Sequence, residues 1–346
     1  MEFALTSDQK MMQESIGRTL ERVSPLEAVR RGDSAFAALK ELGVPGIVIA
    51  ENHGGLGLDL LDAALVAEQL GRYVARAPFV ASAVMAPLAL KHTAWLEKLA
   101  RGEVTAGVAI SEHAAGARDG AAIAVRNRKL DGSALFVLDF EADLYVVADR
   151  DGELYLVPAD AKGLIRTALT AIDATRRIGK LEFDRVAAEP LNAPPGTLDR
   201  MIDAGRVILA ADTLGAAEAM LEKAVAYSKE RKQFGRVIAS FQAVKHMCAE
   251  MAAEIEPCRA LVWYAAYAFD AKPEESRRLA AHAKAHLSEV GPFVARTATE
   301  VHGGMGFTDL LGLHYWFKRI GFDRQLLGGP ERAREDAARA QGWLGN

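Results

Sequence analysis

The pattern of apolar and polar residues divides the chain into three parts, of which the first is helical. Between residues 6 and 102 apolar positions recur every three or four residues, which is the period of an amphipathic helix. Thr6 and Gln9 have the spacing of a capping box at the start of the first such segment. Further helices are predicted over residues 34–41, 60–70, 78–91 and 94–101.

The pattern of apolar and polar residues changes near Val104, where short apolar runs separated by Gly, Asp and Asn favour β-strands. The dipeptide Asp151-Gly152 between two of these runs predicts a hairpin turn. Several short strands in close succession indicate a small barrel or sandwich. The predicted strands lie at residues 106–110, 121–125, 134–138, 144–148, 154–157 and 178–183.

Pro190, Pro194 and Pro195 predict a linker, after which the helical period returns. Pro257 is expected to kink the second of the later helices or to end it early. Long helices joined by short loops indicate a bundle. The later helices are predicted over 197–230, 237–271, 274–301, 309–319 and 330–343. The predicted fold is therefore α+β, with an N-terminal helical domain (1–103), a central β domain (104–193) and a C-terminal four-helix-type bundle (194–346).

The composition excludes several classes of protein. Half of the 346 residues are hydrophobic but only 7% are aromatic, and 64 alanines make the difference. Such a chain is not disordered, and its alanine content predicts long helices that approach closely. A net charge of −4 gives no nucleic-acid-binding surface. We find no run of about eighteen apolar residues and no signal-peptide pattern, so we expect no membrane span and a cytoplasmic location.

The spacing of cysteines and histidines predicts no metal site. Cys248 and Cys258 lie ten residues apart, which matches no metal or redox motif. His282 and His286 lie four residues apart on a predicted helix, but no nearby cysteine supplies a third ligand. We interpret all four as ordinary bundle residues.

Two glycine-containing joints in the C-terminal part carry candidate chemistry. The first is Glu230-Arg-Lys-Gln-Phe-Gly235, which by itself indicates a helix that ends in basic residues and is capped by glycine. The second is His302-Gly-Gly-Met-Gly-Phe-Thr308, whose glycines let a backbone approach a phosphate near the start of the next helix. Each joint alone is also typical of an ordinary helix connection.

Together, the two joints resemble the acyl-CoA dehydrogenase family. Pro45 to Leu58, with Glu-Asn-His-Gly-Gly-Leu-Gly-Leu, is similar to that family's N-terminal signature, and Ile110-Ser-Glu112 resembles the loop that opens its β domain. The resemblance covers essentially the whole chain. It implies an enzyme that holds FAD between the β domain and the bundle, converts an acyl-CoA to a 2-enoyl-CoA, and passes electrons to an electron-transfer flavoprotein.

The resemblance also implies roles for individual residues. Arg231 matches an arginine that reaches the FAD diphosphate of a neighbouring subunit, which implies an oligomer with its interface on the bundle. Arg206 matches an arginine near the substrate site, and an ion pair with Asp203 or Asp212 is the alternative interpretation. The other implied FAD contacts are Ile110, Ser111, Phe136, Leu138, Phe234, Gln242, Glu300, Gly303 and Gly304.

The sequence departs from the family at the catalytic base. Family members remove the α-proton with a glutamate at one of two positions, and these positions are Gly328 and Gly205 here. Glycine cannot accept a proton. Asp309, near the start of the helix after the second joint, is the leading substitute, and a helix N-cap or first-turn acid is its other interpretation.

These departures, together with Glu300, Phe136 and Leu138 in place of a glutamine, a tryptophan and a threonine, leave three hypotheses open. In the first, the chain is one half of a heteromer in which a paralogue shares the flavin and the base. The stretch Asp173-Ala-Thr-Arg-Arg resembles such bacterial members. In the second, the chain is a homodimer or homotetramer with a relocated base. In the third, it is a scaffold subunit that binds no flavin.

Overall fold

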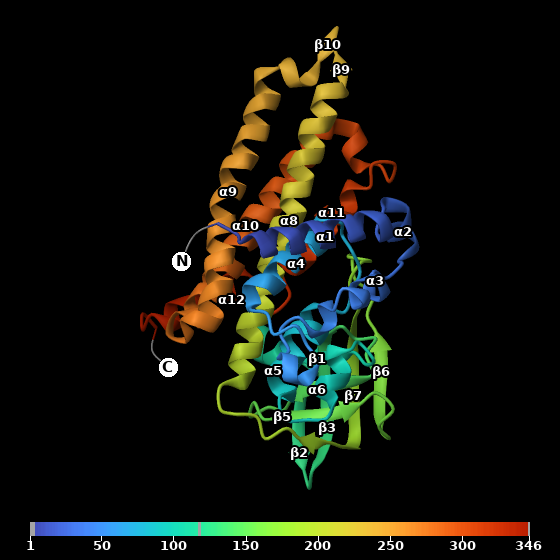
Figure 1. The fold of residues 1–346 in the computed structure, drawn as a ribbon, viewed down its shortest axis with the longest axis vertical. Helices are drawn as coiled ribbons and strands as arrows, with labels where there is room; N and C mark the ends of the chain where they lie inside the picture. Colours follow the sequence, from blue (N-terminus) through green and yellow to red (C-terminus); the bar gives the residue numbers. More distant parts are fainter. Residues whose placement is uncertain (1–3, 117–118, 345–346) are drawn as a thin grey trace.

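The computed structural model of this protein describes residues 4–116 and 119–344, and it begins with helices as the periodicity predicts (Figure 1). The predicted capping box is confirmed: the Thr6 hydroxyl accepts the N–H of Gln9, and the Gln9 side chain accepts the N–H of Thr6. The helical segments are α1 (Ser7–Val23), α2 (Leu26–Arg31), α3 (Phe36–Glu41), α4 (Leu60–Arg72), the π-helical η3 (Val80–Met85), α5 (Ala86–Leu90) and α6 (Trp95–Ala100).

A curled sheet follows, in the strand order β6-β7-β3-β1-β4-β5-β8, with β2 paired to β3. The predicted hairpin at Asp151-Gly152 is confirmed, because the strands before and after it pair antiparallel. The strand β6 was not predicted: it lies at the sheet edge with most of its residues exposed, so it lacks an alternating pattern. The two-residue strand β8, which contains Pro190 of the expected linker, was not predicted either. The strands are β1 (Ala106–Ala109), β2 (Ala122–Arg126), β3 (Lys129–Leu138), β4 (Leu144–Ala148), β5 (Leu154–Pro158), β6 (Leu164–Ala168), β7 (Ile178–Ala187) and β8 (Glu189–Pro190).

The last part is a helical bundle. Its helix α9 continues through Pro257, so the early end, one of the two expected outcomes, was wrong, and the kink stays a prediction. The flanking residues Ile255 and Cys258 are buried against the bundle, and this packing holds the helix across the missing N–H. The helices are α8 (Thr197–Glu230), α9 (Gln242–Ala271), α10 (Pro273–His302), α11 (Leu313–Asp323) and α12 (Pro330–Ala340).

Helices α4 and α8 cross with their backbones in contact, as the small-residue composition leads one to expect. A Cβ atom on Gly215 of α8 would lie 1.8 Å from the carbonyl oxygen of Glu68, and one on Gly71 would lie 1.9 Å from that of Asp212. Only glycine fits at such a crossing. The contact fixes the N-terminal helices against the middle of α8.

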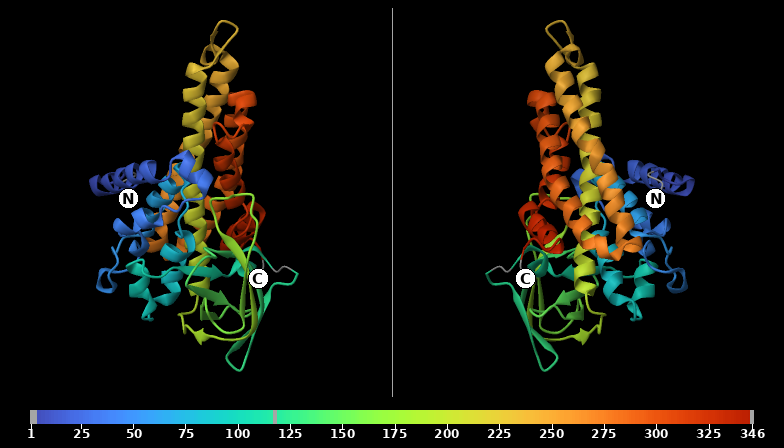
Figure 2. Two further views of the ribbon diagram at one scale, coloured as in Figure 1. Left: turned by 90° about the vertical axis from the view of Figure 1, so that its right-hand side faces the viewer. Right: turned by 90° about the vertical axis from the view of Figure 1, so that its left-hand side faces the viewer.

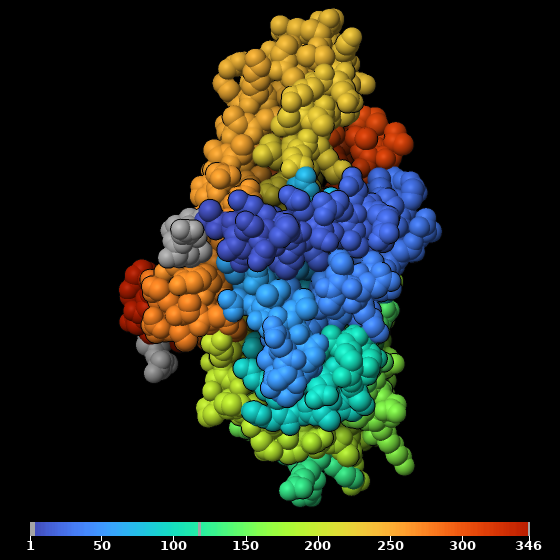
Figure 3. All heavy atoms as spheres, viewed as in Figure 1, coloured from blue at the N-terminus to red at the C-terminus, as the bar shows by residue number. Residues whose placement is uncertain are grey.

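Helix α8 connects the two ends of the molecule (Figures 1 and 2). The sheet lies around its first turns, whereas its last turns and the start of α9 form an arm that projects beyond the rest of the protein (Figure 3). The arm ends in a small hairpin of β9 (Lys232–Gln233) and β10 (Arg236–Val237). No helix in the described part of the chain is long and apolar enough to cross a membrane.

Candidate functional site

A cavity of about 350 Å³, here called the central cavity, lies where the sheet meets the end of α11. One side comes from the short helix α7 (Ser111–Ala115) and from β3, and the other from α11 and the segment that follows it. The size and the mainly apolar lining are those of a small-molecule site. The lining residues are Ser111, Ala115, Phe136, Ile172, Gly321, Phe322, Gln325, Leu326 and Leu327.

Four of the predicted FAD contacts, the cavity cluster of Ile110, Ser111, Phe136 and Leu138, lie at this place. Ser111 and Phe136 line the cavity, and the Ser111 hydroxyl donates a hydrogen bond of 3.0 Å to the Phe136 carbonyl. Ile110 is buried directly before α7, and Leu138 is buried in the sheet, paired with β1 and β7. The structure therefore brings the cavity cluster together, with two members lining the cavity and two packed behind it.

The backbone of the cavity wall adopts conformations that side chains rarely take. Phe136 has φ +52°, and Leu327 and Gly328 on the opposite side have φ +55° and +95°. Non-glycine residues in this region are uncommon and persist where the surrounding structure enforces them. Such enforced geometry is typical of binding sites.

The two glycines at the family's base positions lie against the cavity wall. A Cβ on Gly205 would lie 2.4 Å from Leu327 Cδ1 and 2.7 Å from Met85 Sδ, so the space for a longer side chain is filled. A Cβ on Gly328 would lie 2.8 Å from the Ala114 carbonyl oxygen, and its positive φ also disfavours other residues. None of the described residues that line the cavity is Asp or Glu.

Arg206 is buried completely and lies behind the cavity lining, and its predicted role near the substrate stays a prediction. Its Nη2 lies 2.7 Å from Oδ2 of Asp336 in α12, a helix that packs on α10; the expected partners Asp203 and Asp212 are therefore corrected to Asp336. The guanidinium also donates to the carbonyls of Leu327 and Ala114, at 3.0 and 3.2 Å. Arg206 thus connects the two sides of the cavity from behind.

Asp309 lies far from the cavity. It precedes α11, whose N-cap is Gly312, whereas the cavity is at the other end of this helix, about 16 Å away at 1.5 Å per residue. Its exposed carboxylate accepts from His314 at 2.9 Å and faces Arg30 Nε at 3.1 Å. The His314 hydrogen bond and the Arg30 charge lower the pKa of Asp309. A distant carboxylate with a lowered pKa is poorly suited to be the base.

The remaining predicted FAD contacts form a second group, the tip cluster, at the projecting end of α8. It comprises Arg231, Phe234, Gln242, Glu300, Gly303 and Gly304. Arg231 is the C-cap of α8, and Phe234 in the following turn is 91% exposed with φ +51°. Gln242 begins α9, where its side chain contacts His246. The Phe234 ring makes an edge contact with Phe241, with centroids 6.0 Å apart, and its outer side is open to solvent.

The second glycine joint is held beside this tip by a ring contact. His302 stacks on Tyr227 of α8 with ring centroids 4.5 Å apart, so the end of α10 lies one turn below Arg231. Nothing lies within 4 Å of the Cβ positions of Gly303 and Gly304, which leaves their backbone open to a ligand. Glu300 is exposed on the preceding turn.

The two clusters are too far apart to hold one cofactor. Arg231 follows Gly205 by 26 residues along one continuous helix, which corresponds to about 39 Å. One FAD molecule is too short to place its flavin ring in the cavity cluster and its diphosphate at Arg231 of the same chain. Within one chain, the cavity cluster and the tip cluster therefore cannot contact the same FAD molecule.

Four buried charged residues near the cavity were not predicted as site residues: Arg176, Asp212, Arg319 and Asp323. Asp212 offered a signal, because it stands within the apolar stretch Ala210-Ala-Asp-Thr-Leu214. A buried charge requires a partner, so its position indicated an ion pair without revealing which one. No group of three or more His, Cys, Asp and Glu able to hold a metal occurs among the described residues.

Comparison with known sequences decides the family. The family model described as "Acyl-CoA dehydrogenase, C-terminal domain" matches residues 197–342, and the corresponding N-terminal domain model matches residues 6–103. The chain belongs to the acyl-CoA dehydrogenase family. This confirms the resemblance and the predicted α+β fold, and it makes the chain a member of a family of oxidoreductases that act on acyl-CoA. The roles of the individual residues remain predictions.

Relatives of this acyl-CoA dehydrogenase family member match it over almost its whole length. Acyl-CoA dehydrogenase IpdE2 of Mycobacterium tuberculosis is 32% identical over 332 residues, covering 93% of this chain and 94% of that protein. The solved structure of the Tcur3481-Tcur3483 steroid ACAD has a TM-score of 0.86 at 27% identity, covering 97% and 98% of the two chains. The ChsE4-ChsE5 complex of Mycobacterium tuberculosis has a TM-score of 0.89 at 23% identity over all of both chains, which shows the shared fold.

Proposed function

We propose that this chain takes part in the FAD-dependent α,β-dehydrogenation of an acyl-CoA thioester to the 2-enoyl-CoA, in the cytoplasm, with electrons passed to an electron-transfer flavoprotein. The observation that carries the proposal is the central cavity, where Ser111 and Phe136 lie together. Family membership supports the reaction class. We also propose the domain boundaries 1–103, 104–193 and 194–346.

The residues present fit FAD. In the proposal the cavity cluster contacts the flavin ring, with Phe136 covering one face, and the tip cluster serves the diphosphate and adenosine of a flavin held by another chain. Arg231 supplies a charge and two open glycines supply backbone N–H groups for an anionic group. When bound, FAD supplies the hydride acceptor. The chain itself excludes water with an apolar lining and fixes the cavity wall through Arg206.

The glycines at positions 205 and 328 favour a second form of this proposal, in which the chain is a half-site subunit. The reaction needs a carboxylate near the α-carbon, and the described cavity lining contains none. A paralogous partner would supply the base, and this chain would contribute Arg231 to the partner's flavin. The likeness to the Tcur3481-Tcur3483 steroid ACAD, whose name joins two different proteins, supports a heteromer.

Anaerobic titration with straight, branched and ring-bearing acyl-CoAs tests the proposal, with flavin absorbance as the measurement. We expect bleaching when the chain is co-produced with a paralogue. Rapid bleaching of the lone chain would exclude the half-site form. A protein that stays colourless under both conditions would contradict FAD binding and favour a scaffold subunit.

A further inference from the structure

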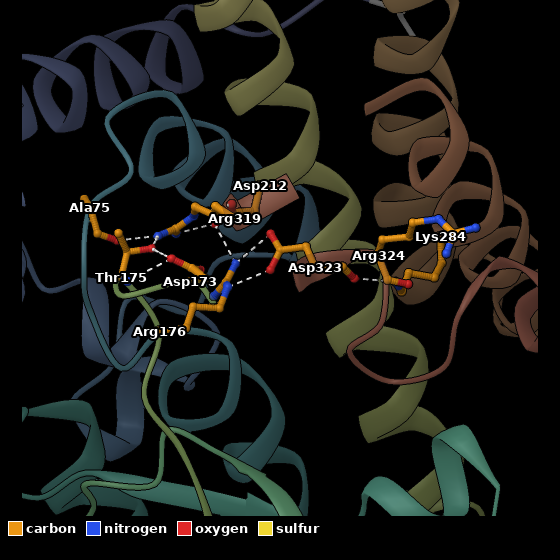
Figure 4. A network of polar contacts seen from close by, with 9 residues as sticks. All are labelled: Ala75, Asp173, Thr175, Arg176, Asp212, Lys284, Arg319, Asp323 and Arg324. Carbon is orange, nitrogen blue, oxygen red and sulfur yellow. Dashed lines mark hydrogen bonds and ion pairs between the residues drawn. The ribbon is translucent and has the colours of Figure 1, made fainter. Parts of the chain in front are cut away.

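A network of charged side chains, shown in Figure 4, joins the loop between β6 and β7 to α8 and α11. Arg176, in the loop between β6 and β7, approaches both oxygens of Asp323, at 2.6 Å from Nε and 2.9 Å from Nη2. Its Nη2 also lies 3.1 Å from Asp212 of α8. One guanidinium thus joins the loop of the sheet to two helices of the bundle.

A second arginine completes the network from the opposite side. Arg319 of α11 makes two bonds to Asp212, at 2.7 and 2.6 Å, and Figure 4 shows both arginines directed at this carboxylate. Its Nη1 donates to the Ala75 carbonyl at 3.1 Å and to Thr175 Oγ1 at 2.9 Å. The network therefore fixes the same loop through two neighbouring residues, Thr175 and Arg176.

The network touches both segments that border the cavity on this side. Asp323 is the last residue of α11, and its neighbours Phe322 and Gln325 line the cavity. Ile172, four residues before Arg176, lines it from the loop. Ile172 is 68% exposed, so little apolar packing holds it in place. The position of Ile172 in the cavity wall therefore depends on the polar contacts of Thr175 and Arg176, which follow it in the loop.

Lys284 of α10 holds the C-terminal end of α11, to which Arg176 is attached through Asp323. Its buried ammonium donates to the carbonyls of Asp323 and Arg324, at 2.5 and 3.0 Å, where the α11 helix leaves its last carbonyls without intrahelical partners. The end of α11 is therefore a fixed support, and Arg176 attaches the loop to it.

The charge of Arg176 is maintained despite its burial. Burial disfavours the charged form, but the charges of Asp323 and Asp212 outweigh it and raise the pKa of Arg176. Buried ion pairs often stabilise a fold no better than apolar residues of similar volume, so stability alone gives a weak reason for this network. Its geometry, which links three segments at a cavity wall, indicates a positional role.

We propose that Arg176 is a positioning residue that holds the β6–β7 loop on the end of α11, so that Ile172 and Phe322 form a continuous wall of the central cavity. The inference rests on the proposed function only for the identity of the ligand, because the attachment of the loop is a property of the chain itself.

Hydrogen–deuterium exchange of the full chain tests the attachment without any cofactor. In Arg176→Met we expect exchange in residues 169–175 to be at least about tenfold faster, because the loop loses its support. Arg177→Met is the matched control: the adjacent arginine is 47% exposed and lies 3.6 Å from Glu141, so wild-type exchange is expected. Arg176→Lys, which cannot make the forked contact to two carboxylates, should fall between them.

A double variant separates positioning from stability. Arg176→Met combined with Asp323→Asn removes both charges, so it should regain thermal stability relative to Arg176→Met while the loop still exchanges fast. Wild-type exchange in the loop of this double variant, or of Arg176→Lys and Arg176→Met alike, would overturn the proposal.

The ligand is tested separately, with FAD as the probe and with the paralogue present if the wild-type chain requires it. We expect Arg176→Met and the double variant to weaken FAD binding at least about tenfold, and Arg177→Met to match the wild type. If the wild type binds no FAD, the proposed function fails while the exchange result stands. If FAD binding is unchanged in a variant whose loop exchanges fast, the positioning role at the cavity fails.

Discussion

The cavity cluster and the tip cluster are predicted to contact the same kind of cofactor, yet their surroundings are opposite. Ile110, Ser111 and Leu138 are buried and supported on all sides by one chain, whereas Phe234 is 91% exposed at the end of a projecting arm. The cavity is therefore built by this chain, whereas the tip becomes enclosed only if another chain covers it, as we propose. Residues that one sequence motif groups together can thus lie in two separate places of the fold.

The two regions should also respond differently to substitution. The cavity wall depends on buried charges, so changes there act first on folding. The tip has few contacts to lose, so changes there act on binding to FAD or to a neighbouring chain.

The largest effect is expected for Arg206→Met. It leaves Asp336 buried without its principal partner, and such losses cost about 3 to 5 kcal/mol of unfolding free energy. Arg231→Met at the exposed tip is the control and should change stability by less than about 0.5 kcal/mol. Denaturant unfolding of the two variants measures the difference. Equal destabilisation would remove the contrast between the two regions.

The pH dependence of the unfolding free energy should come from buried carboxyl groups away from the tip cluster. Burial raises the pKa of Glu68 to about 8 from 4.5, although its hydrogen bond from Trp263 opposes the shift. Between these values the folded state keeps a proton that the unfolded state releases, so the unfolding free energy falls as pH rises. Each pKa unit corresponds to about 1.4 kcal/mol.

Glu68→Gln should make this fall shallower, most clearly between pH 7 and pH 8, because glutamine carries no titrating proton and the other buried carboxyls with raised pKa values, Asp139, Asp203 and Asp323, titrate at about 6 to 7. Urea unfolding at pH 5 and pH 8 provides the comparison. Glu222→Gln, on the surface of α8, is the matched control and should keep the wild-type slope. A wild-type slope in Glu68→Gln would show that another group is responsible.

At the tip, Arg231→Ala should weaken FAD binding without affecting the fold. Hydrogen bonds to charged groups contribute about 1.5 to 3 kcal/mol, so the dissociation constant should rise by about 10- to 100-fold. Flavin fluorescence measures it. Lys232→Ala, the adjacent exposed cation, is the control, and an equal loss there would indicate a general effect of charge.

The smallest effect is expected for Phe234→Gly. Phe234 has φ +51°, which glycine adopts without strain, and its exposed ring contributes little packing. Stability should therefore rise by less than about 1 kcal/mol, while the oligomer and FAD binding weaken. Calorimetry measures the change in stability, and analytical ultracentrifugation measures the weakening of the oligomer. Lower stability would mean that the ring supports the arm within its own chain.

Periodicity alone predicted much of the fold. Residues 197–230 were predicted as one helix, and α8 has these bounds, because a long helix carries many repeats of its pattern. Residues 164–168 were missed as a strand because an exposed edge strand shows no alternation. Pro257 was given too much weight because tertiary packing compensates for one lost hydrogen bond.

The candidate site was predictable only in part. The motifs named the residues of both clusters but not that about 39 Å separates them, because the distance follows from α8 being straight and continuous. The pairing of Arg206 with Asp336 depends on how α12 packs on α10, which no local pattern encodes. The same holds for Arg176, whose partners are distant in sequence.

Subunit mixing tests the central claim, that the two clusters of one chain serve flavins held in different chains, most directly. Arg231→Ala damages every tip, and Phe136→Ala damages every cavity, so neither variant alone should hold FAD. If two copies of this chain share their sites, co-refolding the two variants restores FAD to about a quarter of the sites, since hybrid dimers contain one intact pair. If wild-type protein without a paralogue holds FAD and mixing the two variants restores none, the clusters of two copies do not share a flavin and the claim is contradicted.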